Sequence, residues 1–234
     1  MANENSKYFA EIIGTFLLVF IGSLSVIVYG GSIGQFGPAG LLAIALAHGL
    51  ALAIIVYSVG HISGAHVNPA VTIGFAVLGK MQLPQATKYV LCQLLGAAIA
   101  GLAVGFLFSA AAQDSAYGAP LPGYGVGPAH AIAIEAIFTG MLVFVVLSTA
   151  ADKRSSAGWH GFAIGMTLAV AILAAGVYTG GSLNPARSFG PAIAAVAYGT
   201  LSSPALGEYW IYAIGPLLGG IIGALVHRYT IAEK

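Results

Sequence analysis

The sequence predicts an all-α membrane protein in which six transmembrane helices surround two re-entrant half-helices. Three observations support this fold class. The 234 residues are 59% hydrophobic and only 6% charged, with a mean hydropathy of +0.93, which leaves too little polar surface for a water-soluble protein of this size. Six apolar stretches have the length of a membrane span. Two shorter apolar stretches each follow a copy of one repeated motif.

Each of the six long stretches is close to the ~20 residues that a spanning helix requires. They run over residues 8–29, 39–59, 86–110, 129–150, 159–178 and 209–229. A transmembrane β-barrel would instead show segments of about ten residues with alternating polarity. The first stretch lacks a convincing signal-peptide cleavage site and precedes another span, so we expect it to remain as the first helix.

The basic residues orient the chain, because lysine and arginine resist translocation. Six alternating spans place nearly all of them on one side of the membrane, namely Lys7, Lys80, Lys88, Lys153, Arg154, Arg228 and Lys234. Both termini are therefore predicted to be cytoplasmic, and their shortness favours a prokaryotic cell membrane. Arg187 is the only basic residue predicted on the other side, and such an isolated arginine calls for a functional explanation.

Several classes of function find no support in the sequence. A net charge of +1 without a long basic cluster gives no reason to expect a nucleic-acid partner. The single cysteine, Cys92, cannot form an internal disulfide. His61 and His160 have no metal-site spacing and no thiolate or carboxylate cluster beside them. We therefore predict no metal and no cofactor.

The chain repeats itself. Glu11 and Thr15 recur as Glu135 and Thr139, and the motif of residues 63–70 recurs, with changes, at 179–186. The single membrane domain of residues 1–234 is thus predicted to consist of two halves, residues 1–110 and 129–234, each with three spans and a half-helix. Because three is odd, the second half must be inverted relative to the first.

Both repeats end in Asn-Pro-Ala, formed by Asn68, Pro69 and Ala70 in the first and by Asn184, Pro185 and Ala186 in the second. The apolar stretches that follow, residues 71–78 and 187–197, are too short to span the membrane. Asparagine is a good N-cap and proline suits the first helical turn, so each stretch is predicted to be a half-helix that starts near mid-membrane.

The loops that approach the two motifs are predicted to line an aqueous path, because non-helical backbone at membrane depth is tolerated only where it is buried in protein or faces water. The predicted pore-lining carbonyls belong to Ser63, Gly64, Ala65, His66, Thr179, Gly180, Gly181 and Ser182. Where the halves meet, Asn68 and Asn184 would donate to one molecule, and the positive ends of both half-helices would repel a cation. Glu11 and Glu135 are predicted to face inward and accept hydrogen bonds from the loop amides.

The doubled Asn-Pro-Ala, the Glu-x-x-x-Thr openings and the stretches 63–72 and 184–191 resemble the aquaporin, or major intrinsic protein, family over nearly the whole chain. The resemblance implies the aquaporin fold and a passive channel for water that excludes protons and ions. It also implies that the protein is no enzyme, and that it is a homotetramer in the lipid membrane with one pore in each subunit.

The resemblance also implies a selectivity filter, whose members lie at fixed offsets from the two motifs: His48, Ile172, Gly181 and Arg187. His48 would offer a ring nitrogen to the solute or hold Arg187 in place. This set is similar to that of plant tonoplast-type aquaporins considered permeable to ammonia, so we expect water and ammonia, or another small neutral solute, to pass. The loop histidine of those relatives has no clear match, since His130 lies too close to Glu135.

Alternatives remain open on the sequence alone. Glycerol facilitators of the family typically carry an acidic residue directly after the filter arginine and a basic one four residues later, whereas this chain has Ser188 and Ala192. A gated or structural member with low conduction is another alternative, and His66 would then be either a pH-sensitive gate or a spacer in the loop. An ion-coupled transporter would need intramembrane acids facing a cavity, and a Ser63–His66 enzyme would lack a third orienting group.

Overall fold

The computed structural model describes residues 3–30, 37–152, 154–155, 158–199 and 203–230. Lys153 and Lys234, which entered the orientation argument, lie outside the described residues, as does most of the connection between Gly30 and Pro38.

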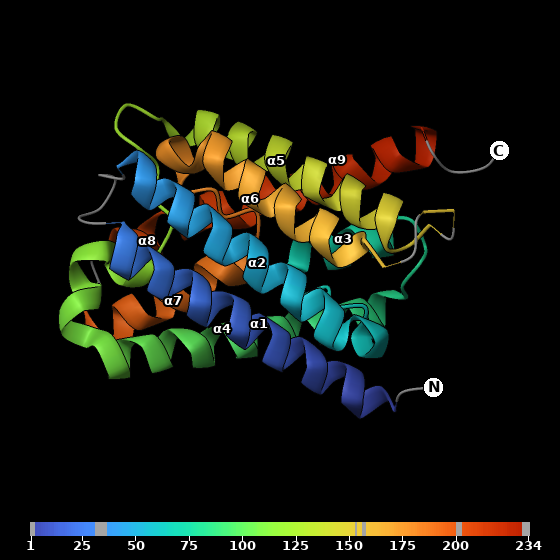
Figure 1. The fold of residues 1–234 in the computed structure, drawn as a ribbon, viewed down its shortest axis with the longest axis horizontal. Coiled ribbons are helices and arrows are strands. Elements are labelled where there is room, and N and C mark those ends of the chain that lie inside the picture. Colours follow the sequence, from blue (N-terminus) through green and yellow to red (C-terminus); the bar gives the residue numbers. More distant parts are fainter. Residues whose placement is uncertain (1–2, 31–36, 153, 156–157, 200–202, 231–234) are drawn as a thin grey trace.

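Six helices among the described residues are long and apolar enough to cross a membrane, as the sequence predicts. They are α1 (Glu4–Tyr29), α2 (Pro38–Ser63), α4 (Leu83–Ala112), α5 (Pro128–Thr149), α6 (His160–Thr179) and α9 (Tyr209–Thr230). They run side by side in one elongated bundle, and α1 begins at the same end at which α9 finishes (Figure 1). Large apolar side chains such as Phe106 and Ile137 are 76% and 67% exposed on the flanks of the bundle. These flanks fit lipid rather than water, so the chain is a multi-pass integral membrane protein.

Two shorter helices follow the Asn-Pro-Ala motifs, α3 (Pro69–Val77) and α7 (Pro185–Tyr198). At about 1.5 Å rise per residue, neither reaches across the ~30 Å hydrocarbon core of a bilayer. In each, the asparagine side chain is the N-cap and the proline is the first helical residue, so both helices begin two residues earlier than the predicted stretches. They lie toward opposite ends of the bundle (Figure 1). The remaining short elements are the 3₁₀ helix η1 (Gln113–Gly118) and α8 (Pro204–Gly207).

The packing of the first three spans is repeated by the second three. α1 packs against α2 and α4, and α5 packs against α6 and α9. The half-helix α7 packs on α4, and α3 packs on α9, so each half-helix rests on the last span of the other half. Contact between α2 and α6 joins the halves directly. This exchange brings the N-termini of α3 and α7 together in the middle of the bundle.

Both long helices that precede a motif end in a left-handed glycine. Gly64, with φ of +91°, caps α2, and Gly180, with φ of +79°, caps α6. Glycine adopts this conformation without steric cost, which lets the chain leave the helix abruptly. The helix α2 therefore continues to Ser63, four residues beyond the predicted end at Val59, and Ser63 and Thr179 are the last helical residues rather than part of the loops.

The crossing of α4 and α7 depends on two glycines. A Cβ on Gly101 would overlap the Gly190 carbonyl oxygen, and a Cβ on Gly190 would overlap the Ala97 carbonyl oxygen. We expect Gly101→Leu to lower the free energy of unfolding by about 3 kcal/mol or more, because backbone cannot move aside as a side chain can. Thermal unfolding in detergent, with Gly207→Leu as control, checks this, since a Cβ on Gly207 would meet nothing within 4 Å. Equal stability of the two variants would contradict the expectation.

Candidate functional site

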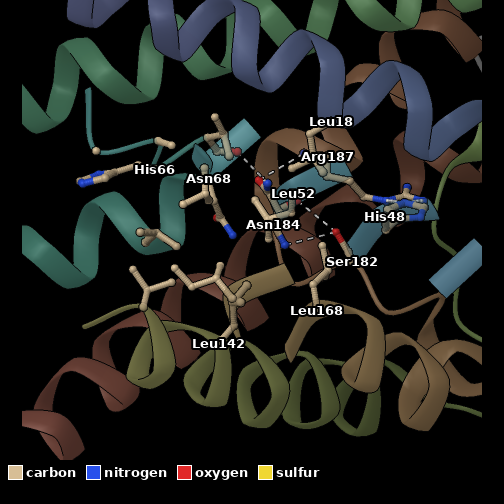
Figure 2. Close-up of a pocket in the computed structure, with 17 residues that line it drawn as sticks. Leu18, His48, Leu52, His66, Asn68, Leu142, Leu168, Ser182, Asn184 and Arg187 are labelled. Atoms are coloured by element: carbon tan, nitrogen blue, oxygen red, sulfur yellow. Dashed lines mark hydrogen bonds between the residues drawn. The ribbon is translucent and has the colours of Figure 1, made fainter. Parts of the chain in front are cut away.

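A narrow cavity of about 30 Å³ lies where the two half-helices meet. One wall is apolar and comes from the spans: Leu18, Leu52, Val56, Leu142, Val146, Ile164 and Leu168. The other wall is polar and comes mainly from the two re-entrant segments. Figure 2 shows His66 at one end of this row of side chains, His48 with Arg187 at the other, and Asn68 and Asn184 between them. The arrangement is a thin path with polar groups along one side.

The two asparagines are fixed in the same way. The Oδ1 of Asn68 accepts from the Ala70 amide at 2.8 Å, and the Oδ1 of Asn184 accepts from the Ala186 amide at 2.9 Å. Each Nδ2 donates one hydrogen across the centre, from Asn68 to the Leu183 carbonyl at 2.8 Å and from Asn184 to the Val67 carbonyl at 2.9 Å. An amide nitrogen carries two hydrogens. One donor of each asparagine thus ties the halves together, and the second remains for a molecule in the cavity.

A buried carboxylate holds the first re-entrant loop. The Oε1 of Glu11 accepts from the Ser63 hydroxyl at 2.7 Å and from the His66 amide at 3.0 Å, and its Oε2 accepts from the Val67 amide at 2.7 Å. Val67 has φ of +41°, a conformation that is costly for a β-branched residue. The carboxylate therefore pins a strained turn and directs the Val67 carbonyl toward Asn184.

Glu135 holds the second loop with the same pattern. Its Oε1 accepts from the Thr179 hydroxyl at 2.8 Å and from the Ser182 amide at 3.0 Å, while its Oε2 accepts from the Leu183 amide at 2.7 Å. Leu183 has φ of +55°, matching Val67. Two separate halves of the chain thus build the same clamp around the same backbone conformation.

Arg187 lies at one end of the cavity and is 3% exposed. Its Nε and Nη2 lie 3.3 and 3.2 Å from the Nε2 of His48, and its Nη1 donates to the Gly118 carbonyl at 2.8 Å. The Nδ1 of His48 lies 2.9 Å from the Ile44 carbonyl, so Nδ1 carries the proton and Nε2 is free to accept. His48 therefore holds the guanidinium rather than donating to a solute.

The positive charge of Arg187 is not paired with a carboxylate among the described residues. The ion pair found there joins Asp152 and Arg154, 2.6 Å apart in the connection between α5 and α6, where hydrogen bonds from Arg154 hold the pKa of Asp152 below its usual range. All the acceptors that contact Arg187 are neutral. Its charge is consequently available to the cavity.

His66 lies at the other end of the cavity. Its Nδ1 lies 3.1 Å from the hydroxyl oxygen of Thr72, which also accepts from the Nε2 of Gln93 at 2.9 Å. Its ring packs against Phe75, with centroids 4.4 Å apart. The corresponding positions of the second half are Ser182 and Ser188, whose hydroxyl groups hydrogen-bond to each other. The imidazole is thus held in place by the fold while still contacting the cavity.

The structure does not bring every predicted lining residue to this cavity. Gly64, Ala65, His66 and Ser182 contact it, whereas Gly180, Gly181 and Ile172 do not. Ser63 and Thr179 do not line it either, and their carbonyls accept from the hydroxyls of Tyr89 and Tyr212. Ile172 is 1% exposed and lies against Gly181, where an added Cβ would stand 3.1 Å from its Cα.

Sequence reasoning missed three supporting residues. The hydroxyl of Tyr89 donates to the Ser63 carbonyl at 2.9 Å, and that of Tyr212 donates to the Thr179 carbonyl at 2.8 Å. Gln93 donates to both Glu11 and Thr72. The two tyrosines are nearly as far apart in the sequence as Glu11 and Glu135. The internal repeat therefore contained a signal that pairs them. Gln93 carries no such signal except its polarity within an apolar span.

The fold and the site together define a membrane channel: six spans, two half-helices and a thin path with polar groups along one side. The family model described as Major intrinsic protein matches residues 2–227. Aquaporin TIP2-1 of Zea mays is 42% identical over 97% of this chain and 87% of its own length. The glycerol uptake facilitator protein-like 6 of Lactiplantibacillus plantarum is 37% identical over 97% of this chain and 99% of its own. The X-ray structure of the aquaglyceroporin from Plasmodium falciparum aligns with a TM-score of 0.82 at 25% identity, covering 98% of this chain and 97% of that one.

The chain belongs to the major intrinsic protein family of aquaporin-type channels. It is accordingly a channel and not an enzyme, and its six spans with two half-helices form an aquaglyceroporin-like fold.

Proposed function

We propose that this channel conducts water and ammonia and excludes protons and ions. The observation that carries the proposal is the pairing of crossed asparagine amides at mid-cavity with an arginine that has no carboxylate partner at the cavity end. Water and ammonia both present a lone pair to N–H donors and both fit a path whose volume is about 30 Å³. No step of the passage requires a reaction or a bound group.

Exclusion of cations follows from charge placed along the path. The N-termini of α3 and α7 meet at the centre, and each contributes the positive end of a helix dipole. The guanidinium of Arg187 adds a full positive charge at one end. The fixed amide hydrogens of Asn68 and Asn184 would also turn a central water so that it accepts from both of them. A water held that way has both lone pairs occupied, so it cannot accept a proton from a neighbouring water in the file.

The filter is proposed to consist of His48, Ile172, Gly181 and Arg187. Since Ile172 and Gly181 pack against each other directly, they would form one apolar side of a constriction whose polar side is Arg187. His48 would act as the support of that polar side. Of these four residues His48 alone carries a ring, and a filter without a second ring would admit ammonia as well as water.

A glycerol facilitator is the second candidate, because one relative is named a glycerol uptake facilitator protein and the fold matches an aquaglyceroporin. The small cavity and the close fit of His48 to Arg187 favour the smaller solutes. A gated family member with low conduction would be built from the same geometry, with His66 at the cavity end as its gate.

We further propose that the two halves, residues 1–110 and 129–234, are inverted repeats within one channel domain. Four chains would form a homotetramer in the lipid bilayer, each with its own pore. The membrane would be that of a prokaryotic cell. Both termini would lie in its cytoplasm, because the end of the bundle at which the termini lie also carries the basic residues Lys7, Lys80, Arg154 and Arg228.

Reconstitution into liposomes tests the proposal. Light scattering after a hyperosmotic step measures water permeability, and an internal pH dye under an ammonium gradient measures ammonia entry. Fast shrinkage with fast alkalinisation supports both permeants, and fast shrinkage alone leaves a water channel. Rates equal to those of empty liposomes would reject an open channel, and fast glycerol equilibration would favour the second candidate.

His48→Leu is expected to lower both the stability of the protein and its water permeability. The substitution leaves the Nε and Nη2 of Arg187 without their acceptor, and a hydrogen bond to a charged group contributes about 1.5–3 kcal/mol. We expect the free energy of unfolding to fall by that amount and water permeability to fall several-fold as the guanidinium shifts. His61→Leu, an exposed position on the same helix, is the matched control. Unchanged stability and permeability in His48→Leu would argue against the support role.

A further inference from the structure

A second cavity, of about 280 Å³, lies at the end of the bundle opposite the termini and shares no lining residue with the central one. Its walls come from η1, from the last turns of α7 and from the start of α8. The polar groups belong to Gln113, Tyr117 and Ser203, and apolar contacts come from Ala116, Ala195 and Pro204. The described residues that line it include no charged side chain.

The hydroxyl of Tyr117 has no hydrogen-bond partner among the described residues, although the side chain is only 2% exposed. A buried hydroxyl without a partner costs about 1–3 kcal/mol. Most such groups in native proteins bind protein, water or a ligand. Ser203 precedes α8 but makes no side-chain capping bond, so its hydroxyl is also available. Two neutral hydroxyls therefore line one pocket, and neither has a hydrogen-bond partner among the described residues.

The backbone at this pocket is strained. Ala116 and Tyr117 have φ of +48° and +58°, and Gly118 follows with φ of +79°. Each non-glycine residue in this region costs about 1–2 kcal/mol. Strain of this kind persists where the surrounding structure enforces it, and it concentrates at ligand clamps and functional sites. Here the turn places Tyr117 on the pocket and, one residue later, places the Gly118 carbonyl on Arg187 at 2.8 Å.

We propose that this pocket binds a small neutral polyhydroxy solute from the aqueous phase, which hydrogen-bonds to the hydroxyls of Tyr117 and Ser203 and thereby holds Gly118 on Arg187. A charged ligand would lose its hydration without compensation, because the described part of the lining carries no opposite charge. Gly118 follows Tyr117 directly in η1, so an occupant that restrains Tyr117 also restrains the Gly118 carbonyl. The binding site stands on the pocket alone, whereas its effect on the filter rests on the proposed role of Arg187.

Binding is tested with erythritol, a neutral four-carbon polyol, on the purified full-length protein. At ten times the dissociation constant, the wild-type Tm is expected to rise by about 3–6 °C, and saturation-transfer NMR is expected to detect the bound polyol. Tyr117→Phe should abolish both signals, Ser203→Ala should weaken the affinity several-fold, and Tyr124→Phe, at a fully exposed tyrosine, should change neither. Equal Tm shifts in wild type and Tyr117→Phe would overturn the site. A second result would also overturn the site: no NMR signal from bound polyol, combined with a Tyr117→Phe protein that is more stable than wild type in polyol-free buffer. The Tyr117 hydroxyl would then be an unsatisfied buried group and not part of a binding site.

The effect on the filter is tested separately in liposomes. Without an occupant to hold the turn, Tyr117→Phe is expected to raise the ratio of glycerol to water permeability at least twofold. Polyol binding that is lost in Tyr117→Phe while this ratio stays unchanged would overturn the link to Arg187 and leave the binding site intact. A wild-type protein that binds erythritol but conducts no water would instead refute the proposed channel function and not the pocket.

Discussion

Replacing Arg187 with leucine is expected to raise cation and proton leakage by about a thousandfold and to let larger neutral solutes pass. A unit charge at 4 Å is worth about 4 kcal/mol at an effective dielectric constant of 20, which corresponds to roughly three orders of magnitude in rate. No described carboxylate forms a hydrogen bond with the guanidinium, whose partners are His48 and the Gly118 carbonyl. Leucine removes the charge and also shortens the side chain at the cavity end.

Proteoliposomes with an internal pH dye and an imposed potential measure the leak, and glycerol equilibration measures the widening. Arg228→Leu removes an exposed arginine of α9 and serves as the matched control. Ion leakage equal in the two variants would show that the helix dipoles and asparagines exclude cations without Arg187. Glycerol exclusion retained in Arg187→Leu would place the constriction elsewhere.

The arrangement of helices was predictable because the membrane imposes simple rules. Continuous apolar runs, the repeat and the basic residues specify six helices and two half-helices without knowledge of packing. The ends were less predictable. Glycine caps at Gly64 and Gly180 decide where α2 and α6 stop, and both lie inside the motifs for which the sequence predicts loops.

The site was predictable where the repeat duplicates a residue and less so where one residue works alone. Glu11 and Glu135 share a motif, and their clamps on the two loops are nearly identical. The role of His48 depends on which atom its ring faces, which the sequence does not specify; in the structure its Nε2 lies 3.2 Å from the Nη2 of Arg187. Gln93 and the turn at Gly118 have no counterpart in the other half, so no internal comparison pointed to them.

The crossed asparagine bonds show why that duplication matters for the centre of the channel. Each asparagine receives its acceptor from the opposite loop, at Val67 or Leu183. Val67 and Leu183, which carry those carbonyls, both have a left-handed backbone conformation, and the amide of each donates to a glutamate carboxylate. The position of the central donors in one half therefore depends on the carboxylate of the other half.

Glu135→Gln tests this dependence and is expected to destabilise the fold by about 3–5 kcal/mol, the range for removing one partner from a buried charged network. The Thr179 hydroxyl and the amides of Ser182 and Leu183 all donate to the carboxylate. An amide keeps the size of the side chain but replaces one acceptor with a donor, so at least one of these groups is left facing another donor. Since folded proteins are stable by only about 5–15 kcal/mol, this is a large share.

Thermal unfolding followed by size-exclusion chromatography measures the loss, with Glu4→Gln, an exposed carboxylate in the first turn of α1, as the matched control. Glu11→Gln should behave like Glu135→Gln, because its carboxylate holds the equivalent loop and also accepts from Gln93. In folded protein that survives either change, the strained turn should relax and withdraw the carbonyl from the asparagine of the other half, so water permeability should fall. A Glu135→Gln channel with wild-type stability and permeability would mean that helix packing alone sets the loop and that the carboxylate is dispensable.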